Sequence, residues 1–255
     1  MTLPDNIFGI DTKKAYEEFI AEAEKKEETT EPVIITPAHI NNPEQYIILE
    51  ARTHGTYSYP DILIDRERSH QGTDWFQAHE ALHQENAVML TIRQYVDFIN
   101  LLKSGKAFDG GGNKVPKQKL DDILDDMLTK RNPYRAEWLD ADFKLHGKLL
   151  YIHYNHRTIN NKLEPQTKEQ LDPNTLMQDK TPGISLEDWL KNATFQGLSH
   201  KNIQDGDLYY WFPRSGNNSV AWFGADADRV DLGCDGNPQS SSVGLGVRRA
   251  LNSVK

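Results

Sequence analysis

Two segments near the C-terminus alternate apolar residues with polar residues or glycine, and no other feature of the chain constrains its fold as strongly. The apolar positions are Ala221, Phe223, Ala225 and Ala227 in the first segment, and Val230, Leu232 and Cys234 in the second. Successive side chains of a β-strand point to opposite faces of a sheet, so this pattern is typical of strands with one buried face. We therefore predict two strands that bury these residues and turn the residues between them outward.

The last fifth of the chain, residues 202–254, also has an unusual composition. The sequence of 255 residues contains 18 Lys and 16 Glu, yet this stretch contains no Lys, no Glu and no Met. At the average frequency of the chain, it would hold about seven Lys and Glu residues. It also carries seven of the 17 Gly, which weaken strands and need a reason at outward positions. Chance is a poor explanation for this composition.

The overall counts exclude several classes of protein. A net charge of −9 without a stripe of Lys and Arg argues against nucleic-acid binding. No apolar run approaches the roughly 20 residues of a membrane-spanning helix. The single Cys234 excludes an intramolecular disulfide, and the N-terminus does not resemble a signal peptide, so we expect a cytoplasmic protein. Surface display would require another route of export.

Local patterns predict where the helices and strands lie. Expected helices cover 11–28, 73–85, 91–104, 120–128 and 185–191, where apolar residues recur at helical spacing or a capping residue opens the segment. Expected strands are Val33–Thr36, Tyr46–Ala51, Ile62–Ile64, Ala141–Leu145, Leu149–Tyr154, Leu208–Phe212, Ser219–Ala225, Val230–Cys234 and Val243–Arg248. A polar connection over 160–180 is expected to be a loop. Helices first and strands last predict an α+β fold, with residues 1–30 as a separate amphipathic helix.

One motif points to metal chemistry. His79-Glu80-Ala81-Leu82-His83 matches the pattern H-E-x-x-H on an expected helix, in which two His bind zinc and the Glu activates a water molecule. The extended form of the motif requires a further His at position 89, where this chain has Met89. Two ordinary polar residues of a helix are the alternative interpretation. We keep a zinc metallohydrolase as the second hypothesis, and our first expects no catalytic residue, no metal and no cofactor.

Several C-terminal motifs resemble a known family. Tyr210–Arg214, Asn217–Ala221, Leu232–Pro238 and Leu245–Ala250 are similar to the variable region of the variable proteins of diversity-generating retroelements. Upstream, Thr91–Phe98 and Arg135–Phe143 are similar to the archaeal branch of that family. The resemblance implies a C-type lectin-like α+β fold over residues 31–255, with helices in its N-terminal half and short antiparallel strands in its C-terminal half. It also implies a non-enzymatic, receptor-like protein that binds a protein or a cell-surface molecule through a variable region at about 210–250.

The genetics of that family offer a cause for the unusual composition. Its retroelements randomise template adenines, so AAY codons become NNY, which cannot encode Lys, Glu, Met, Gln or Trp. Trp222 would then be a fixed aromatic anchor among exchangeable neighbours. The predicted ligand-binding residues are Trp222, Gly224, Asp226, Asp228, Arg229, Asp231, Gly233, Asp235, Gly236, Ser240, Ser242 and Gly244. Because outward side chains tolerate change, we expect substitutions of Gly233 and Asp235 to leave the melting temperature nearly unchanged.

A third hypothesis assigns the main contact to the N-terminal helix. In that case the protein would be a structural or partner-docking module, and deletion of residues 1–30 would abolish its assembly. The charges of this helix also fit an ordinary solvated face. The sequence leaves both the ligand and the oligomeric state open.

Overall fold

The computed structural model describes residues 6–7, 10–11, 41–214 and 218–252. Contacts between residues divide the chain into two units, Met1–Ile34 and Ile35–Lys255. In the first unit, β1 (Asn6–Ile7) pairs antiparallel with β2 (Ile10–Asp11). The helix predicted over 11–28, apart from Asp11 in β2, and the strand predicted at 33–36 lie outside the described residues.

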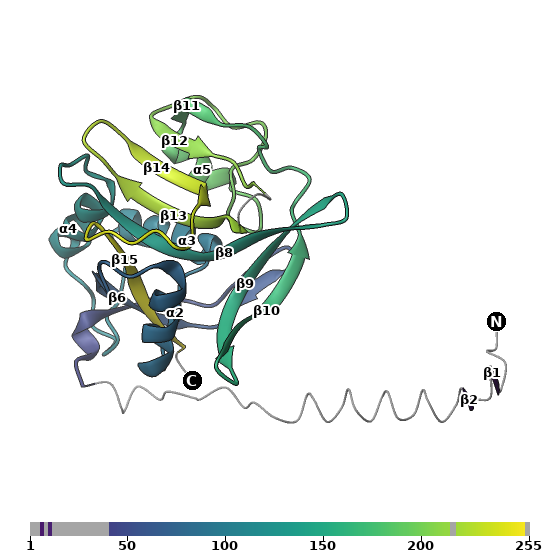
Figure 1. Cartoon of the computed structure of the whole chain (residues 1–255). Helices are drawn as coiled ribbons and strands as arrows, with labels where there is room; N and C mark the ends of the chain where they lie inside the picture. Colours follow the sequence, from purple (N-terminus) through teal and green to yellow (C-terminus); the bar gives the residue numbers. More distant parts are fainter. Residues whose placement is uncertain (1–5, 8–9, 12–40, 215–217, 253–255) are drawn as a thin grey trace. The chain divides into compact units, whose positions relative to one another are not determined.

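Over the described residues, the second unit is built on one large mixed sheet of eleven strands (Figure 1). Its main path runs in the order β11-β12-β14-β13-β8-β15-β6-β3, with β7 paired to β15, β9 to β8 and β10 to β9. The strands are β3 (Tyr46–Leu49), β6 (Ile62–Ser69), β7 (Val88–Met89), β8 (Arg135–His146), β9 (Leu149–Ile159), β10 (Lys162–Gln170), β11 (Lys180–Ile184), β12 (Leu208–Trp211), β13 (Val220–Ala225), β14 (Val230–Gly236) and β15 (Leu245–Asn252). A separate hairpin joins β4 (Arg52–His54) and β5 (Tyr57–Tyr59), and a 3-10 turn, η2 (Pro43–Gln45), directly precedes β3.

This architecture overturns the predicted fold class. The sequence predicted a C-type lectin-like α+β fold with helices in the N-terminal half and short antiparallel strands in the C-terminal half. Instead, one sheet draws strands from both halves of the described chain, and the pairs β12/β14 and β8/β15 are parallel. The prediction failed because it treated strands as local hairpins, whereas β15 inserts between β8 and β6 from far along the chain.

A predicted loop is also wrong. Residues 160–180 contain β10, which pairs with β9 over most of its length. Its side chains alternate between exposed and half-buried, and none is fully buried. The strand therefore carries no apolar signal, and its backbone hydrogen bonds to β9 hold it in place.

The helices are α2 (Trp75–Gln84), α3 (Ile92–Ser104), α4 (Lys117–Leu128) and α5 (Leu186–Asn192). Three of the predicted helix starts are confirmed by side-chain caps, whereas α4 begins three residues before the predicted position and has no side-chain cap. Asp74 and Thr91 each form a reciprocal capping box with the residue three positions later, and Ser185 caps α5. Gly105 ends α3 with a φ of 67°. No helix in the described part of the chain is long and apolar enough to cross a membrane.

Hydrophobic side chains cover the central strands on both faces. On one face, Phe223, Leu232 and Cys234 belong to a cluster with apolar residues of α3, α4 and α5, as the alternation predicted. On the other face, Trp138 and Val220 belong to a second cluster that includes residues of α2. The face that the sequence assigned to solvent is therefore partly covered.

Candidate functional site

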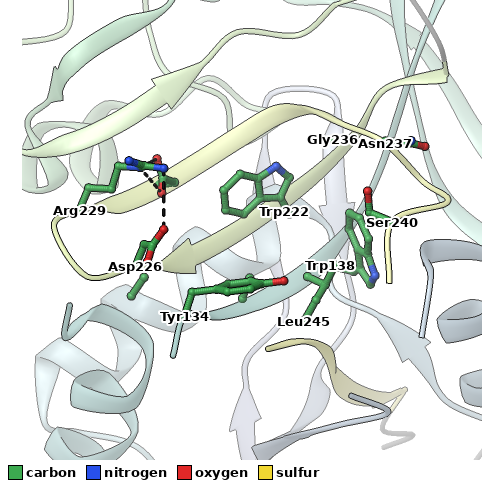
Figure 2. Close-up of a pocket in the computed structure, with 12 residues that line it drawn as sticks. Tyr134, Trp138, Trp222, Asp226, Arg229, Gly236, Asn237, Ser240 and Leu245 are labelled. Atoms are coloured by element: carbon green, nitrogen blue, oxygen red, sulfur yellow. Dashed lines mark hydrogen bonds and ion pairs between the residues drawn. The ribbon is translucent and has the colours of Figure 1, made fainter. Parts of the chain in front are cut away.

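A pocket of about 320 Å³ opens on this second face, above β8, β13 and β14 (Figure 2). Its lining residues are Tyr134, Ala136, Trp138, Trp222, Ala225, Asp226, Arg229, Asp231, Gly236, Asn237, Ser240 and Leu245. Tyr134, Trp138 and Trp222 contribute three aromatic rings, and Asp226 and Arg229 lie at one end (Figure 2). Arg229 pairs there with Asp231. The pocket thus combines a large apolar surface with a small charged group, as small-molecule and side-chain binding sites do.

Trp222 lies against the backbone of β14. In the register of the sheet it is opposite Gly233 of β14 on one side and Trp138 of β8 on the other. A Cβ atom on Gly233 would lie 2.2 Å from Nε1 of Trp222, and one on Gly236 would lie 2.8 Å from its Cδ1. Real Cβ atoms do not approach so closely, so both positions must be glycine for the ring to lie where it does.

Three carboxylates surround one guanidinium at the edge of the pocket. Nε of Arg229 lies 3.2 Å from Asp231 Oδ2, and its Nη atoms lie 3.4 Å from Asp228 and 3.9 Å from Asp226. The negative charge of Asp231 raises the pKa of Arg229 most, and the charges of Asp228 and Asp226 raise it further. Arg229 therefore remains charged. Asp231 is 2% exposed and also accepts a hydrogen bond from Nε1 of Trp211 at 3.3 Å. Burial raises the pKa of Asp231, and Trp211 and Arg229 oppose that rise.

The structure brings together half of the residues that the sequence singled out. Six of the twelve line the pocket, namely Trp222, Asp226, Arg229, Asp231, Gly236 and Ser240. The other six lie outside the lining: Gly224, Asp228, Gly233, Asp235, Ser242 and Gly244. Asp226, Asp228, Arg229, Asp235 and Ser240 are exposed or half-buried, whereas Trp222 and Gly236, which are also half-buried, pack closely against each other.

The expectation of an outward, solvent-facing surface fails at four positions. Gly224, Asp231, Gly233 and Gly244 are buried. A Cβ on Gly224 would lie 2.9 Å from the carbonyl oxygen of Arg135, and one on Gly244 would lie 2.4 Å from that of Tyr134. Strand alternation could not reveal this, because the second hydrophobic cluster covers the face that a two-layer fold would leave open.

Sequence reasoning missed the contribution of β8. Tyr134 precedes this strand and Trp138 lies within it, at 37% and 2% exposure, and both line the pocket. Trp138 donates a hydrogen bond from Nε1 to the carbonyl oxygen of Thr73, which fixes its ring. These residues are far from the C-terminal segment in sequence, and only the pairing of β8 with β13 brings them beside Trp222.

The H-E-x-x-H motif does not form a converging pair of histidines. His79 is 4% exposed, whereas Glu80 and His83 are exposed. Burial lowers the pKa of His79 to about 4, so its ring is neutral at neutral pH. Among the described residues, the side chains that could share a metal ion with His79 are Asp140 and His156, not His83.

No protein-family model, curated protein or solved structure matches this chain.

Proposed function

We propose that this chain is a non-enzymatic binding protein that holds its ligand on an aromatic pocket surrounded by exchangeable side chains. The observation that carries this proposal is the pocket itself, which gathers six residues selected from sequence alone. Aromatic rings supply large contact areas at low cost in conformational entropy. A pocket of about 320 Å³ fits one inserted side chain or small headgroup, in keeping with a protein or cell-surface ligand.

The exchangeable positions in this proposal form a rim around fixed aromatic residues. The rim consists of Asp226, Asp228, Arg229, Asp235 and Ser240, which are exposed or half-buried. The floor consists of Tyr134, Trp138 and Trp222. Rim residues would set which ligand binds, and the floor would supply an affinity common to all variants.

We further propose that a diversity-generating retroelement varies the rim. Support comes from the stretch without Lys, Glu and Met, which NNY codons cannot encode. Trp211 and Trp222 cannot arise from such codons either. Both have close partners in the sheet, because Trp211 donates a hydrogen bond to Asp231 and Trp222 packs against the glycines of β14. A cytoplasmic location stays a prediction from sequence.

The DNA around the gene tests the source of variation. We expect a reverse-transcriptase gene and a near-copy of the codons for residues 210–250. The copy should differ from the gene where it carries adenines, at the codons of the five rim residues. The retroelement would be contradicted if no such copy exists. It would also be contradicted if the gene and the copy differ as often at the tryptophan codons as at the rim codons.

A selection experiment tests binding separately. The five rim codons are randomised as NNY, the proteins are displayed on phage, and binders are selected against hen lysozyme and streptavidin as unrelated probes. The matched control library randomises five exposed residues of β10, namely Lys162, Glu164, Gln166, Lys168 and Gln170. We expect binders from the rim library alone, and a loss of binding when Trp222→Ala is introduced. Equal enrichment from both libraries would refute a dedicated binding surface.

A further inference from the structure

Three buried polar side chains meet where α2, β8 and β9 come together. His79, Asp140 and His156 are 4%, 2% and 5% exposed. One potential ligand atom from each lies within 4.8 Å of the others. Two imidazoles and a carboxylate are donors that zinc and similar divalent metals prefer. The proposed binding pocket uses none of the three.

His79 is the unsatisfied member of this cluster. Its Nε2 atom is buried and makes no hydrogen bond. The nearest carboxylate oxygen, Asp140 Oδ1, lies 3.7 Å away, which is too long for a hydrogen bond. Buried polar atoms without a partner are rare and costly, so this one needs an explanation.

The backbone holds the other two residues in position. The ladder between β8 and β9 ends at the pair Asp142 and His153, and Asn155 then adopts a φ of 56°. His156 consequently donates its backbone N–H to Asp140 Oδ2 at 3.0 Å, and its Nδ1 lies 2.5 Å from Asp140 Oδ1. A left-handed asparagine within a strand is an unusual conformation that the surroundings must stabilise.

Trp75 forms an apolar wall beside both histidines. Its ring centroid lies 4.3 Å from that of His79 and 5.0 Å from that of His156, both edge to face. Nε1 of Trp75 donates to the carbonyl oxygen of Leu139 at 3.1 Å, so the ring itself is fixed. The ring covers one side of the cluster with apolar surface, and apolar surroundings strengthen the interaction between an ion and its ligands.

We propose that His79, Asp140 and His156 bind one divalent transition-metal ion, with zinc as the expected species. Neighbouring ligands of a tetrahedral zinc lie about 3.3 Å apart, close to the distance between His79 and Asp140. His156 and Asp140 would separate by less than about 1 Å, and His156 would bind the ion through Nδ1 as a neutral ring with its proton on Nε2. A ring that is protonated on both nitrogens would release its Nδ1 proton to solvent on binding. The three residues leave a fourth position for water. Such an ion would link α2 to β8 and β9, and its role would be structural because Glu80 faces away from it.

The proposed site combines His79 with His156, whereas the hydrolase hypothesis combines His79 with His83. His83 therefore provides a matched control. His79→Asn and His83→Asn make the same change on one helix, one buried and one exposed. Protein from a zinc-supplemented culture, and protein stripped with a chelator and reloaded with Zn²⁺ alone, are analysed for metal content and melting temperature. We expect one zinc per chain in the wild type and in His83→Asn, and at least about 100-fold weaker binding in His79→Asn.

Cobalt reports on the ligands even if His79→Asn does not fold. Wild-type protein loaded with Co²⁺ should show the intense visible bands of four-coordinate cobalt, unchanged in His83→Asn. Less than stoichiometric zinc in the wild type, loss of metal in His83→Asn, or the weak bands of six-coordinate cobalt would each overturn the proposal.

Discussion

At the scale of single residues, glycine decides where Trp222 can lie. We predict that Gly233→Ser displaces the Trp222 ring and destabilises the fold by about 1–3 kcal/mol, because the new Cβ would lie only 2.2 Å from Nε1 of Trp222. This expectation replaces the one drawn from sequence alone, which treated Gly233 as freely exchangeable. Thermal unfolding and tryptophan fluorescence measure the two effects. Asp228→Ser, at a side chain that is 71% exposed, is the control. A melting temperature of Gly233→Ser equal to that of the control would refute the prediction.

A second residue-scale prediction concerns a carboxylate in the core. Glu137 is fully buried between Arg135 and Arg248, with Arg248 Nη2 at 2.7 Å from its Oε1. Glu137→Gln removes the charge that compensates both arginines and should cost about 3–5 kcal/mol. The same change at Glu187, which is 71% exposed and pairs with Lys103, should cost less than about 1 kcal/mol. Denaturant titration compares the two variants, and similar losses would argue against a charge effect.

The pH dependence of stability should report on the same group. Burial alone would raise the pKa of Glu137, but Arg135 and Arg248 outweigh it and lower this pKa to about 2, from an ordinary value of 4.5. The stabilisation is therefore complete above about pH 4.5 and is lost as the pH falls toward 2. We expect the free energy of unfolding to fall more steeply over this range in the wild type than in Glu137→Gln. Parallel curves would contradict this assignment.

At the scale of helices and strands, the sequence predicts elements that local chemistry sets. Asp74, Thr91 and Ser185 each begin a helix as predicted, because a cap needs only a side chain and the next turn. By contrast, β10 forms a hairpin with the adjacent β9, but it has no fully buried side chain that would mark it as a strand. The position of β15 depends on partners distant in the chain, and its residues carry no mark of that pairing. The aromatic partner Trp138 was missed for the same reason.

One of these caps should matter more than the others. Thr91 is 3% exposed, accepts a hydrogen bond from the backbone of Gln94, and shares a second one with the hydroxyl of Tyr57 at 2.5 Å. We predict that Thr91→Ala costs more than the ~1 kcal/mol of an ordinary cap, because it also leaves the buried Tyr57 hydroxyl without this partner. Asp74→Ala, at a cap with no such second contact, is the comparison. Denaturant titration should show a larger loss in the free energy of unfolding for Thr91→Ala than for Asp74→Ala. Thr91→Ser keeps the hydroxyl group and should lose much less than Thr91→Ala.

At the scale of the whole molecule, the sheet separates positions that can vary from positions that cannot. β13 and β14 lie inside the sheet, with hydrophobic clusters on both faces, so outward alternation does not guarantee freedom to change. Two criteria, namely that a residue can be encoded by an NNY codon and that the structure leaves room for other side chains, therefore select different subsets of the same segment. Rim residues satisfy both criteria, and the close-packed glycines satisfy only the first.

This difference leads to a prediction about libraries of variants. One library randomises the five rim codons as NNY, and a second does the same at Gly224, Gly233, Gly236 and Gly244. Rim side chains are exposed or half-buried, so most changes there should alter stability by less than about 0.5 kcal/mol each. Arg229 is the exception, because its loss leaves the buried Asp231 without its ion pair. A Cβ on any of the four glycines would meet an atom at 2.9 Å or closer, at a cost of about 1–3 kcal/mol each. Four such changes together are comparable to the roughly 5–15 kcal/mol that stabilises a typical domain. Protease resistance of displayed clones measures the folded fraction, which should be high in the first library and near zero in the second. Comparable fractions would mean that the strands shift to accept larger residues, and that the variable surface extends over β14 itself.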